Sequence, residues 1–260
     1  MEQVTESNEK KGNALRPLVM NYELLADLFY YPESKSDLLK TKEVYKYLCK
    51  ALPEAAEAMQ AYVDYTELAS ISEIQELFLR SFDLQAITTL DIGFVLFGED
   101  YKRGKLLVHL NQEHREVNND CHNELSDHLP NILNLLPKMK DESIRNDIAT
   151  MLLMPAIEKM IKEFSTEKIE KKDEVYKKHQ KVLLDYSTRY RTVYQTLLQA
   201  AFIALKKDFD YESEHYEEMV ANAGTSDETS ACHSCGSNMP TGTEKDFVQN
   251  IETEMLTEKQ

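Results

Sequence analysis

The spacing of apolar residues is the strongest structural signal in this sequence. In the segments 15–29 and 174–207, apolar side chains recur every three or four residues, which places them on one face of a helix. Glycine and proline number only seven each among 260 residues, whereas leucine, lysine, glutamate and alanine are abundant. Because the abundant residues are helix formers, we expect an all-α fold with a single compact helical domain. The hydrophobic content of 42% is sufficient for one sizeable core.

Charge is unevenly divided along the chain. Residues 208–260 contain 13 acidic and 2 basic residues, so they hold −11 of the formal charge of −16. The apolar pattern fades there into Gly, Ser, Thr, Asn and acidic residues, which favours disorder, although a short helix near 246–256 fits the pattern. We therefore expect a flexible N-terminus over 1–13, a helical domain over 14–207 and an acidic, mostly disordered tail over 208–260.

The same acidic balance argues against nucleic acid as a partner, because such a partner requires a basic surface that releases counterions. A cationic peptide suits the charge better. No stretch approaches the roughly 20 apolar residues of a membrane span, and residues 1–12 lack an apolar signal core. Four scattered cysteines do not form a disulfide framework. We therefore expect a cytoplasmic protein without membrane insertion.

Capping residues, prolines and breaks in the apolar pattern set the expected helix boundaries. Pro155 is expected to kink or divide the helix that contains it. The apolar run 92–97 fits either a buried strand or a helix, and we favour a helix because a lone strand would leave its backbone groups unpaired. The predicted helices are 15–29, 36–52 capped by Ser36-Asp37, 53–68 opened by Pro53, one opened by a capping box of Ser72 and Gln75, 92–97, 101–116, 129–136 capped by Asp127, 141–164, and 174–207 as the longest.

Glu124, Asp127 and His128 form the first candidate site, at the start of a predicted helix. A carboxylate beside an imidazole fixes its tautomer and tunes its pKa near neutrality, so the group fits an acid–base or ligand site. In the alternative interpretation, Asp127 caps the helix and His128 makes a buried structural hydrogen bond. No nucleophile elbow and no glycine-rich phosphate loop accompanies the group.

Two further segments have both a functional and a structural interpretation. The loop from Gly98 to Gly104 fits either a ligand contact through exposed backbone N–H groups or a solvated connection between helices. The tail motif Cys232-His233-Ser-Cys235 supplies two thiolates and an imidazole, which suit a metal, or it is incidental in a mobile tail. His179 and the tyrosines at 186, 190 and 194 fit a helix core better than a cofactor site.

Three short blocks resemble the NarJ/TorD family of redox-enzyme maturation chaperones, most closely its NarJ branch. The first is Tyr30-Tyr31-Pro32, similar to an early tyrosine–proline signature. The second joins Glu76-Leu-Phe78 and Phe82-Asp83 to Gly98-Glu99 and Arg103-Gly104. The third, Glu124-Leu-Ser-Asp-His-Leu-Pro130, resembles the hallmark Glu-Leu-Pro-Asp-His-Leu-Pro, with Ser126 in place of a proline. Phe97 also stands where a histidine is common in the family, and the cysteine-bearing tail has no family counterpart.

The resemblance implies a TorD-like helical bundle that acts as a system-specific chaperone and not as an enzyme, with no cofactor of its own. Its partner would be the N-terminal segment of a nitrate reductase-like molybdoenzyme catalytic subunit, held until the molybdenum cofactor is inserted. The chain would be a monomer or a helix-swapped dimer. The residues that would bind the client peptide are Glu124, Asp127, His128, Pro130, Gly98, Glu99, Arg103, Gly104, Phe78 and Phe82.

Two other functions remain as alternatives. One is a helical metal-binding protein or sensor that uses Cys232, His233 and Cys235. The other is a plain scaffold protein.

Overall fold

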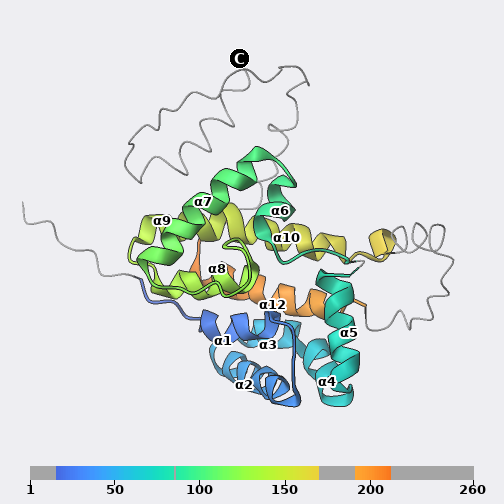
Figure 1. The fold of residues 1–260 in the computed structure, drawn as a ribbon. Coiled ribbons are helices and arrows are strands. Elements are labelled where there is room, and N and C mark those ends of the chain that lie inside the picture. The colour runs from blue at the N-terminus through green and yellow to red at the C-terminus, as the bar shows by residue number, and fades with distance from the viewer. Residues whose placement is uncertain (1–15, 85, 170–190, 212–260) are drawn as a thin grey trace, which may run out of the picture.

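A computed structural model describes residues 16–84, 86–169 and 191–211, and these residues form helices joined by short turns (Figure 1). The all-α prediction is confirmed, since within these residues the only pairing of extended backbone is one antiparallel bridge between Asp91 and His128. The helices are α1 (Tyr22–Ala26), η1 (Asp27–Phe29), α2 (Lys35–Ala51), α3 (Pro53–Ala58), α4 (Gln60–Leu68), α5 (Ile71–Phe82), α6 (Ile92–Phe97), α7 (Tyr101–Glu116), α8 (Leu129–Leu135), η2 (Leu136–Lys138), α9 (Glu142–Asp147), η3 (Ile148–Leu153), α10 (Met154–Glu163) and α12 (Val193–Asp208).

Helix α12 lies at the centre of the fold, between α3 and α4 on one side and α10 on the other (Figure 1). Its apolar positions are buried, as the spacing predicts, and Tyr194, Leu197 and Ala201 are each at most 1% exposed. Helix α1 packs on α8, and α6 packs on both α7 and α10. One continuous core therefore joins the beginning and the end of the described chain.

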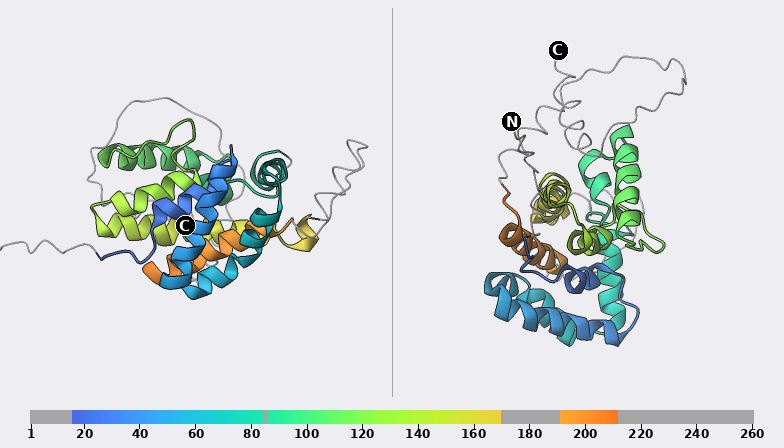
Figure 2. Two further views of the ribbon diagram at one scale, coloured as in Figure 1. Left: turned by 90° about the horizontal axis from the view of Figure 1, so that it is seen from below. Right: turned by 90° about the vertical axis from the view of Figure 1, so that its left-hand side faces the viewer.

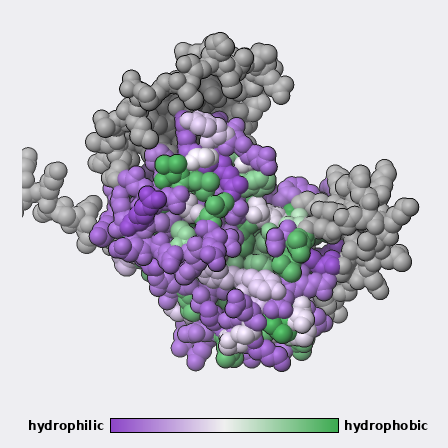
Figure 3. Space-filling view, viewed as in Figure 1, coloured by the Kyte–Doolittle hydropathy of each residue, from purple (hydrophilic) through white to green (hydrophobic). Residues whose placement is uncertain are grey.

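Helix α7 stands at the margin of the molecule, where α6 supports one of its faces (Figure 2). Its outer face exposes Tyr101 and Val108, which are 75% and 67% accessible. Figure 3 shows apolar patches among the polar surface in this upper part of the molecule. The sequence blocks 98–104 and 124–130 adjoin this helix, one at each of its ends.

A buried carboxylate joins the two ends of the described chain. Asp208, in the last turn of α12, accepts hydrogen bonds from the backbone N–H groups of Val19 and Met20 at 2.7 and 3.0 Å. Its Oδ2 also accepts from the hydroxyl of Tyr22 at 2.9 Å. Burial is the largest of the effects that raise the pKa of this tyrosine, so the hydroxyl remains a donor. Asp208 thus fixes the chain entering α1 onto α12.

Several predicted helix starts are wrong, by about seven residues for α1 and by two residues for the caps of α2 and α5. Helix α1 begins at Tyr22, where the side chain of Asn21 caps it, and not near residue 15. The cap of α2 is Ser34, with Asp37 at the third helical position completing the box. The cap of α5 is Ser70, whose hydroxyl accepts from the backbone N–H of Glu73, so the predicted Ser72–Gln75 box does not form. Two serines lie two residues apart at the start of α2 and again at the start of α5, and in each case the earlier serine is the cap.

Pro155 divides the segment 141–164, as predicted. The chain follows α9 with the π-helical turn η3 and resumes an α-helix at Met154. Proline has no N–H to donate into the preceding turn, so a widened turn before it is a natural accommodation. The run 92–97 is helical as expected, and 101–116 matches α7 residue for residue.

Some predictions fall outside the described residues. These include the tail motif Cys232-His233-Ser-Cys235, His179, and most of the helix expected over 174–207. Arg191 and Thr192 form a turn before α12, so a helix uninterrupted from 174 to 207 is wrong at that point. Among the helices that the structure describes, none is long and apolar enough to cross a membrane.

Replacing Asp208 with Ala is expected to lower the free energy of unfolding by about 3 kcal/mol, because three donors lose their acceptor in a buried setting. Urea unfolding followed by circular dichroism would measure the loss. The matched control is Asp210→Ala, two residues further on at an exposed position. Equal effects of the two substitutions would contradict this role for Asp208.

Candidate functional site

The hallmark segment around Asp127 and His128 is fastened by its backbone to the residues that open α6. The N–H of Ile92 donates to the carbonyl of Asp127 at 2.9 Å, and the N–H of Leu129 donates to the carbonyl of Leu90 at 2.8 Å. These bonds form the single antiparallel bridge of the described residues. Two segments distant in the sequence therefore have a fixed relative register, on which the side-chain contacts depend.

Arg103 links the two acidic residues of this junction. Its Nε donates to Asp127 Oδ2 at 3.1 Å, and its Nη2 donates to Asp91 Oδ2 at 3.0 Å. Asp91 accepts a further hydrogen bond from His128 Nδ1 at 3.0 Å. The prediction that Asp127 caps α8 is wrong, since its side chain points to Arg103 and the residue at the cap is His128. The guanidinium of Arg103 offers the Asp127 carboxylate a full positive charge, which the backbone N–H groups at a helix cap do not.

Asp127 is fully buried, and its environment opposes ionisation. Burial raises the pKa of Asp127, and the Asp91 charge adds to the rise, while Arg103 opposes both. The pKa of Asp91 is lowered, chiefly by the hydrogen bond from His128. Gly93 makes the close approach possible, because a Cβ on this residue would lie 2.6 Å from Asp127 Oδ2. The cluster is thus a packed internal junction in this conformation.

A second buried network holds the loop that follows α7. Asn131, fully buried in α8, donates from Nδ2 to the carbonyls of Cys121 and Leu125 at 3.3 and 2.9 Å. The Nε2 atom of His114 lies 3.0 Å from the backbone carbonyl oxygen of Ser126, within hydrogen-bond distance. The side chain of Asn119 reaches His114 Nδ1 at 2.8 Å. The loop 121–126 is consequently fixed from both sides, and it carries Glu124 outward.

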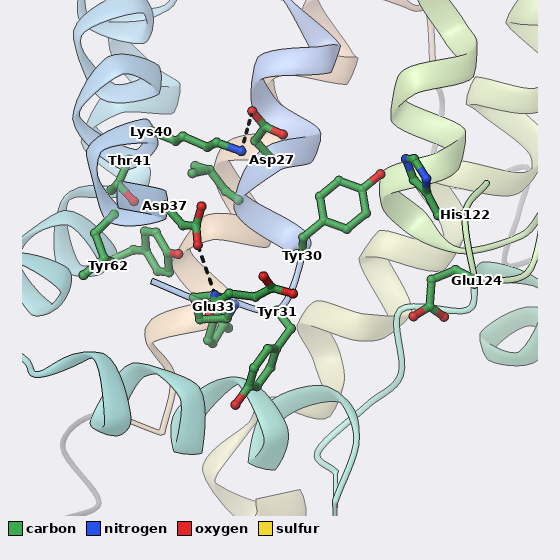
Figure 4. A pocket seen from close by; sticks show the side chains of 14 residues that line it. Asp27, Tyr30, Tyr31, Glu33, Asp37, Lys40, Thr41, Tyr62, His122 and Glu124 are labelled. Atoms are coloured by element: carbon green, nitrogen blue, oxygen red, sulfur yellow. Dashed lines mark hydrogen bonds and ion pairs between the residues drawn. The ribbon is translucent and has the colours of Figure 1, made fainter. Parts of the chain in front are cut away.

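The largest concentration of motif residues surrounds a pocket of about 400 Å³. Tyr30, Tyr31 and Pro32 line it from the turn after η1, and Glu124 lines it from the fixed loop, so the first and third blocks meet there (Figure 4). In Figure 4 the Tyr30 ring points toward His122, with Glu124 below that histidine. The complete lining is Asp27, Leu28, Tyr30, Tyr31, Pro32, Glu33, Asp37, Leu38, Lys40, Thr41, Tyr62, His122, Glu124 and Tyr194.

Acidic side chains dominate the charge of this pocket. Four carboxylates and one lysine line it, and that lysine, Lys40, lies 3.2 Å from Asp27. Asp37 accepts hydrogen bonds from the backbone N–H groups at the start of α2. Within the described residues, the carboxylates of Glu33 and Glu124 have no hydrogen-bond or ion-pair partner. Two acidic groups therefore remain available to a cationic ligand.

Aromatic rings form the apolar part of the same pocket. Tyr31 is 42% exposed and meets Phe78 edge to face, with ring centroids 5.7 Å apart. The hydroxyl of Tyr30 accepts a hydrogen bond from Asn134 at 3.2 Å, which fixes its ring. Rings of this kind bind aliphatic groups and stack with guanidinium groups. The pocket therefore suits a ligand that combines positive charge with apolar surface.

Six of the ten predicted client-binding residues lie in three different places. Glu124 is exposed at the pocket, and Arg103, Asp127 and His128 form the junction described above. Phe78 and Phe82 are at most 8% exposed and pack with Tyr194 in the aromatic core, so they support the pocket from behind.

The remaining predicted residues do not reach the pocket. Gly98 ends α6 with a positive φ of 64°, and Glu99 is exposed beside it, before the start of α7. Gly104 belongs to α7 and faces open space, so the predicted loop of 98–104 is shorter than expected. Pro130 is buried in the first turn of α8.

Sequence reasoning did not assign Asp91 or Glu33 to a site. Asp91 is the single acidic residue within the apolar run 88–97. A lone carboxylate in such a run indicates that its side chain pairs with a specific polar or charged residue. Glu33 directly follows the Tyr30-Tyr31-Pro32 block, and only its spatial relation to Glu124 gives it significance. No cluster of three His, Cys, Asp or Glu side chains in the described part of the chain could hold a metal ion.

Replacing Arg103 with Met is expected to cost about 3 kcal/mol of stability near neutral pH, because the Asp127 carboxylate would be left buried without its cation. Without Arg103 the pKa of Asp127 rises further above the unfolded value of about 4. A carboxyl with a raised folded pKa loses stability as pH rises, so the cost should be smaller at about pH 5 than at about pH 7.

Urea unfolding at both pH values would measure this difference. Arg80→Met is the control, because Arg80 pairs with Glu76 on the surface of α5, where such pairs contribute about 0.5 kcal/mol. A cost for Arg103→Met that is the same at both pH values would contradict the assignment to Asp127.

No protein-family model matches the chain, and no curated protein matches its sequence.

Proposed function

We propose that this protein is a cytoplasmic chaperone of the NarJ/TorD type, which binds the N-terminal segment of a molybdoenzyme catalytic subunit. In this proposal the client is a nitrate reductase-like enzyme, and the chaperone holds its segment while the molybdenum cofactor is inserted and the complex assembles. The protein binds and releases its client without catalysing a reaction. The all-α fold is the class that the motif resemblance implies.

The observation that carries the proposal is the meeting of two motif blocks at one pocket. Tyr30-Tyr31-Pro32 and Glu124 are more than 90 residues apart in the chain and line the same cavity of about 400 Å³. Residues needed only for folding would be expected in the interior, whereas Tyr31 and Glu124 are exposed. Their position supports a role in recognition.

The chemistry of the pocket fits a cationic, partly apolar peptide. Glu33 and Glu124 supply negative charge at its rim, and Tyr30 and Tyr31 supply ring faces. In such interfaces the apolar anchors contribute most of the affinity, while charge chiefly steers association and selects the partner. A leader segment with Arg or Lys among apolar residues combines both features.

Asp127 and His128 have an indirect role in this proposal. The Asp127 side chain is fully covered and paired with Arg103, so it does not touch a peptide in this conformation. It holds the hallmark segment against α6 and α7, and the same segment carries the loop of Glu124. Asp127 is therefore a positioning residue for the client pocket.

The test titrates the full chain with a synthetic N-terminal peptide of the molybdoenzyme catalytic subunit that is encoded beside its gene. Isothermal calorimetry should detect binding. The double substitution Glu33→Gln and Glu124→Gln should weaken it about fivefold, since each exposed ion pair contributes about 0.5 kcal/mol. Raising the salt concentration should reduce this difference.

The matched control is Glu54→Gln with Glu57→Gln, two exposed glutamates on α3 that do not line the pocket. This variant has the same change of net charge and should bind as the natural chain does. If no molybdoenzyme leader produces heat or competes for binding, the proposed function is wrong. If both variants weaken binding equally, the pocket is not the recognition site.

A further inference from the structure

A second pocket, of about 550 Å³, lies between α6, α10 and the chain that precedes α6. Ala86, Ile87, Phe94 and Val95 give it apolar walls. Phe94 is 40% exposed, so much of its ring surface remains accessible at this pocket. Figure 3 shows apolar surface at the place where α6 and α10 meet in Figure 1. None of its lining residues lines the acidic pocket.

The rim of this second pocket is basic. Lys159, Lys162 and Lys168 line it together with one acid, Glu163, which pairs with Lys168. Burial lowers the pKa of Lys159, and the charge of Lys162 lowers it further. An anionic group beside these lysines would offset both effects. In a chain with a formal charge of −16, this is a local surface of the opposite sign.

The described chain ends beside the same helix. The hydroxyl of Tyr211 donates to Glu158 Oε2 on α10 at 2.9 Å, and its ring packs edge to face on Phe202. Tyr211, the last described residue, is therefore held against α10, the helix that also carries Lys159 and Lys162. Residues 212–246 supply 35 residues of chain between Tyr211 and the segment 247–256. A random coil of that length would span on the order of 30 Å, which is sufficient to reach the pocket.

The sequence near the C-terminus has the complementary pattern. Phe247, Ile251 and Met255 recur at four-residue intervals, so a helix would carry them on one face. Asp246, Glu252 and Glu254 lie among them, and the only lysine between residues 212 and 258 is Lys245. The segment 246–256 therefore combines an apolar stripe with negative charge.

We propose that the acidic segment 246–256 docks into the lysine-rimmed pocket of its own chain. Phe247 and Ile251 enter the apolar walls beside Phe94, and the acidic residues face Lys159 and Lys162. Docking within one chain is favoured over docking between copies, because a tether of this length gives a millimolar effective concentration. The contact is independent of the client pocket and of the proposed function.

A tryptophan reporter tests this docking in the full-length chain. The natural sequence contains no tryptophan, so Phe247→Trp introduces a single fluorophore on the stripe. Its emission should be blue-shifted, and acrylamide should quench it several-fold less than the tryptophan of Gln249→Trp. Position 249 belongs to the same segment but lies off the stripe.

Charge reversal identifies the surface involved. In the Phe247→Trp chain, Lys159→Glu with Lys162→Glu should increase quenching to the level of the Gln249→Trp chain. Lys46→Glu with Lys50→Glu, at exposed positions on α2, makes the same change of charge and should leave quenching unaltered. Circular dichroism would check that both variants keep their helix content.

Adding Glu252→Lys and Glu254→Lys to the α10 variant should restore the protection of the tryptophan from quenching. Such a rescue would show that the α10 variant loses protection through its charge and not through poor folding. Equal quenching of the Phe247→Trp and Gln249→Trp chains would overturn the proposal. So would protection that is insensitive to the α10 lysines, or protection that grows with protein concentration, because the latter places the segment on a second copy.

Discussion

The ion pair between Arg103 and Asp127 is the contact on which the site depends. It joins the first turn of α7 to the hallmark segment, and the second bond of Arg103, to Asp91, ties both to the start of α6. The Asp127 carboxylate is fully buried and its second oxygen has no partner in the described residues, so Arg103 supplies most of its stabilisation. Backbone bonds between 90–92 and 127–129 fix the geometry in which the pair can form.

The acidic pocket follows from this junction. Once 127–129 is fixed, the buried amide of Asn131 can hold the carbonyls of the preceding loop, and Glu124 extends from that loop toward Tyr30. The opposite wall depends on Asp208, which anchors the chain before α1 and so places the Tyr30-Tyr31-Pro32 turn. Internal ionic and polar contacts thus hold two surface segments at one cavity, which leaves their exposed side chains available for recognition.

The sequence predicted the helices well and their polar contacts less well. Apolar spacing located the buried face of α12, because burial of a helical stripe is a local property of the chain. Helix α6 was predicted because a lone strand over 92–97 would leave its backbone groups unpaired. The predicted caps of α2 and α5 were two residues too late, because each start has two serines, Ser34 and Ser36 or Ser70 and Ser72. Only the path of the preceding chain decides which serine caps the helix. The partner of Asp127 could not be predicted, because Arg103 lies 24 residues away and meets it only through tertiary structure.

Hydrogen–deuterium exchange of the full chain, with and without the N-terminal peptide of its molybdoenzyme client, would show whether the acidic pocket binds the client. Backbone amides in 30–33 and 121–125, the two segments that bring motif residues to the acidic pocket, should exchange more slowly when the peptide is bound. Amides of 90–92 and 127–129, which are already paired inside the junction, should change little. Protection confined to other surfaces, or to the 98–100 loop, would contradict the assignment of this pocket as the client site.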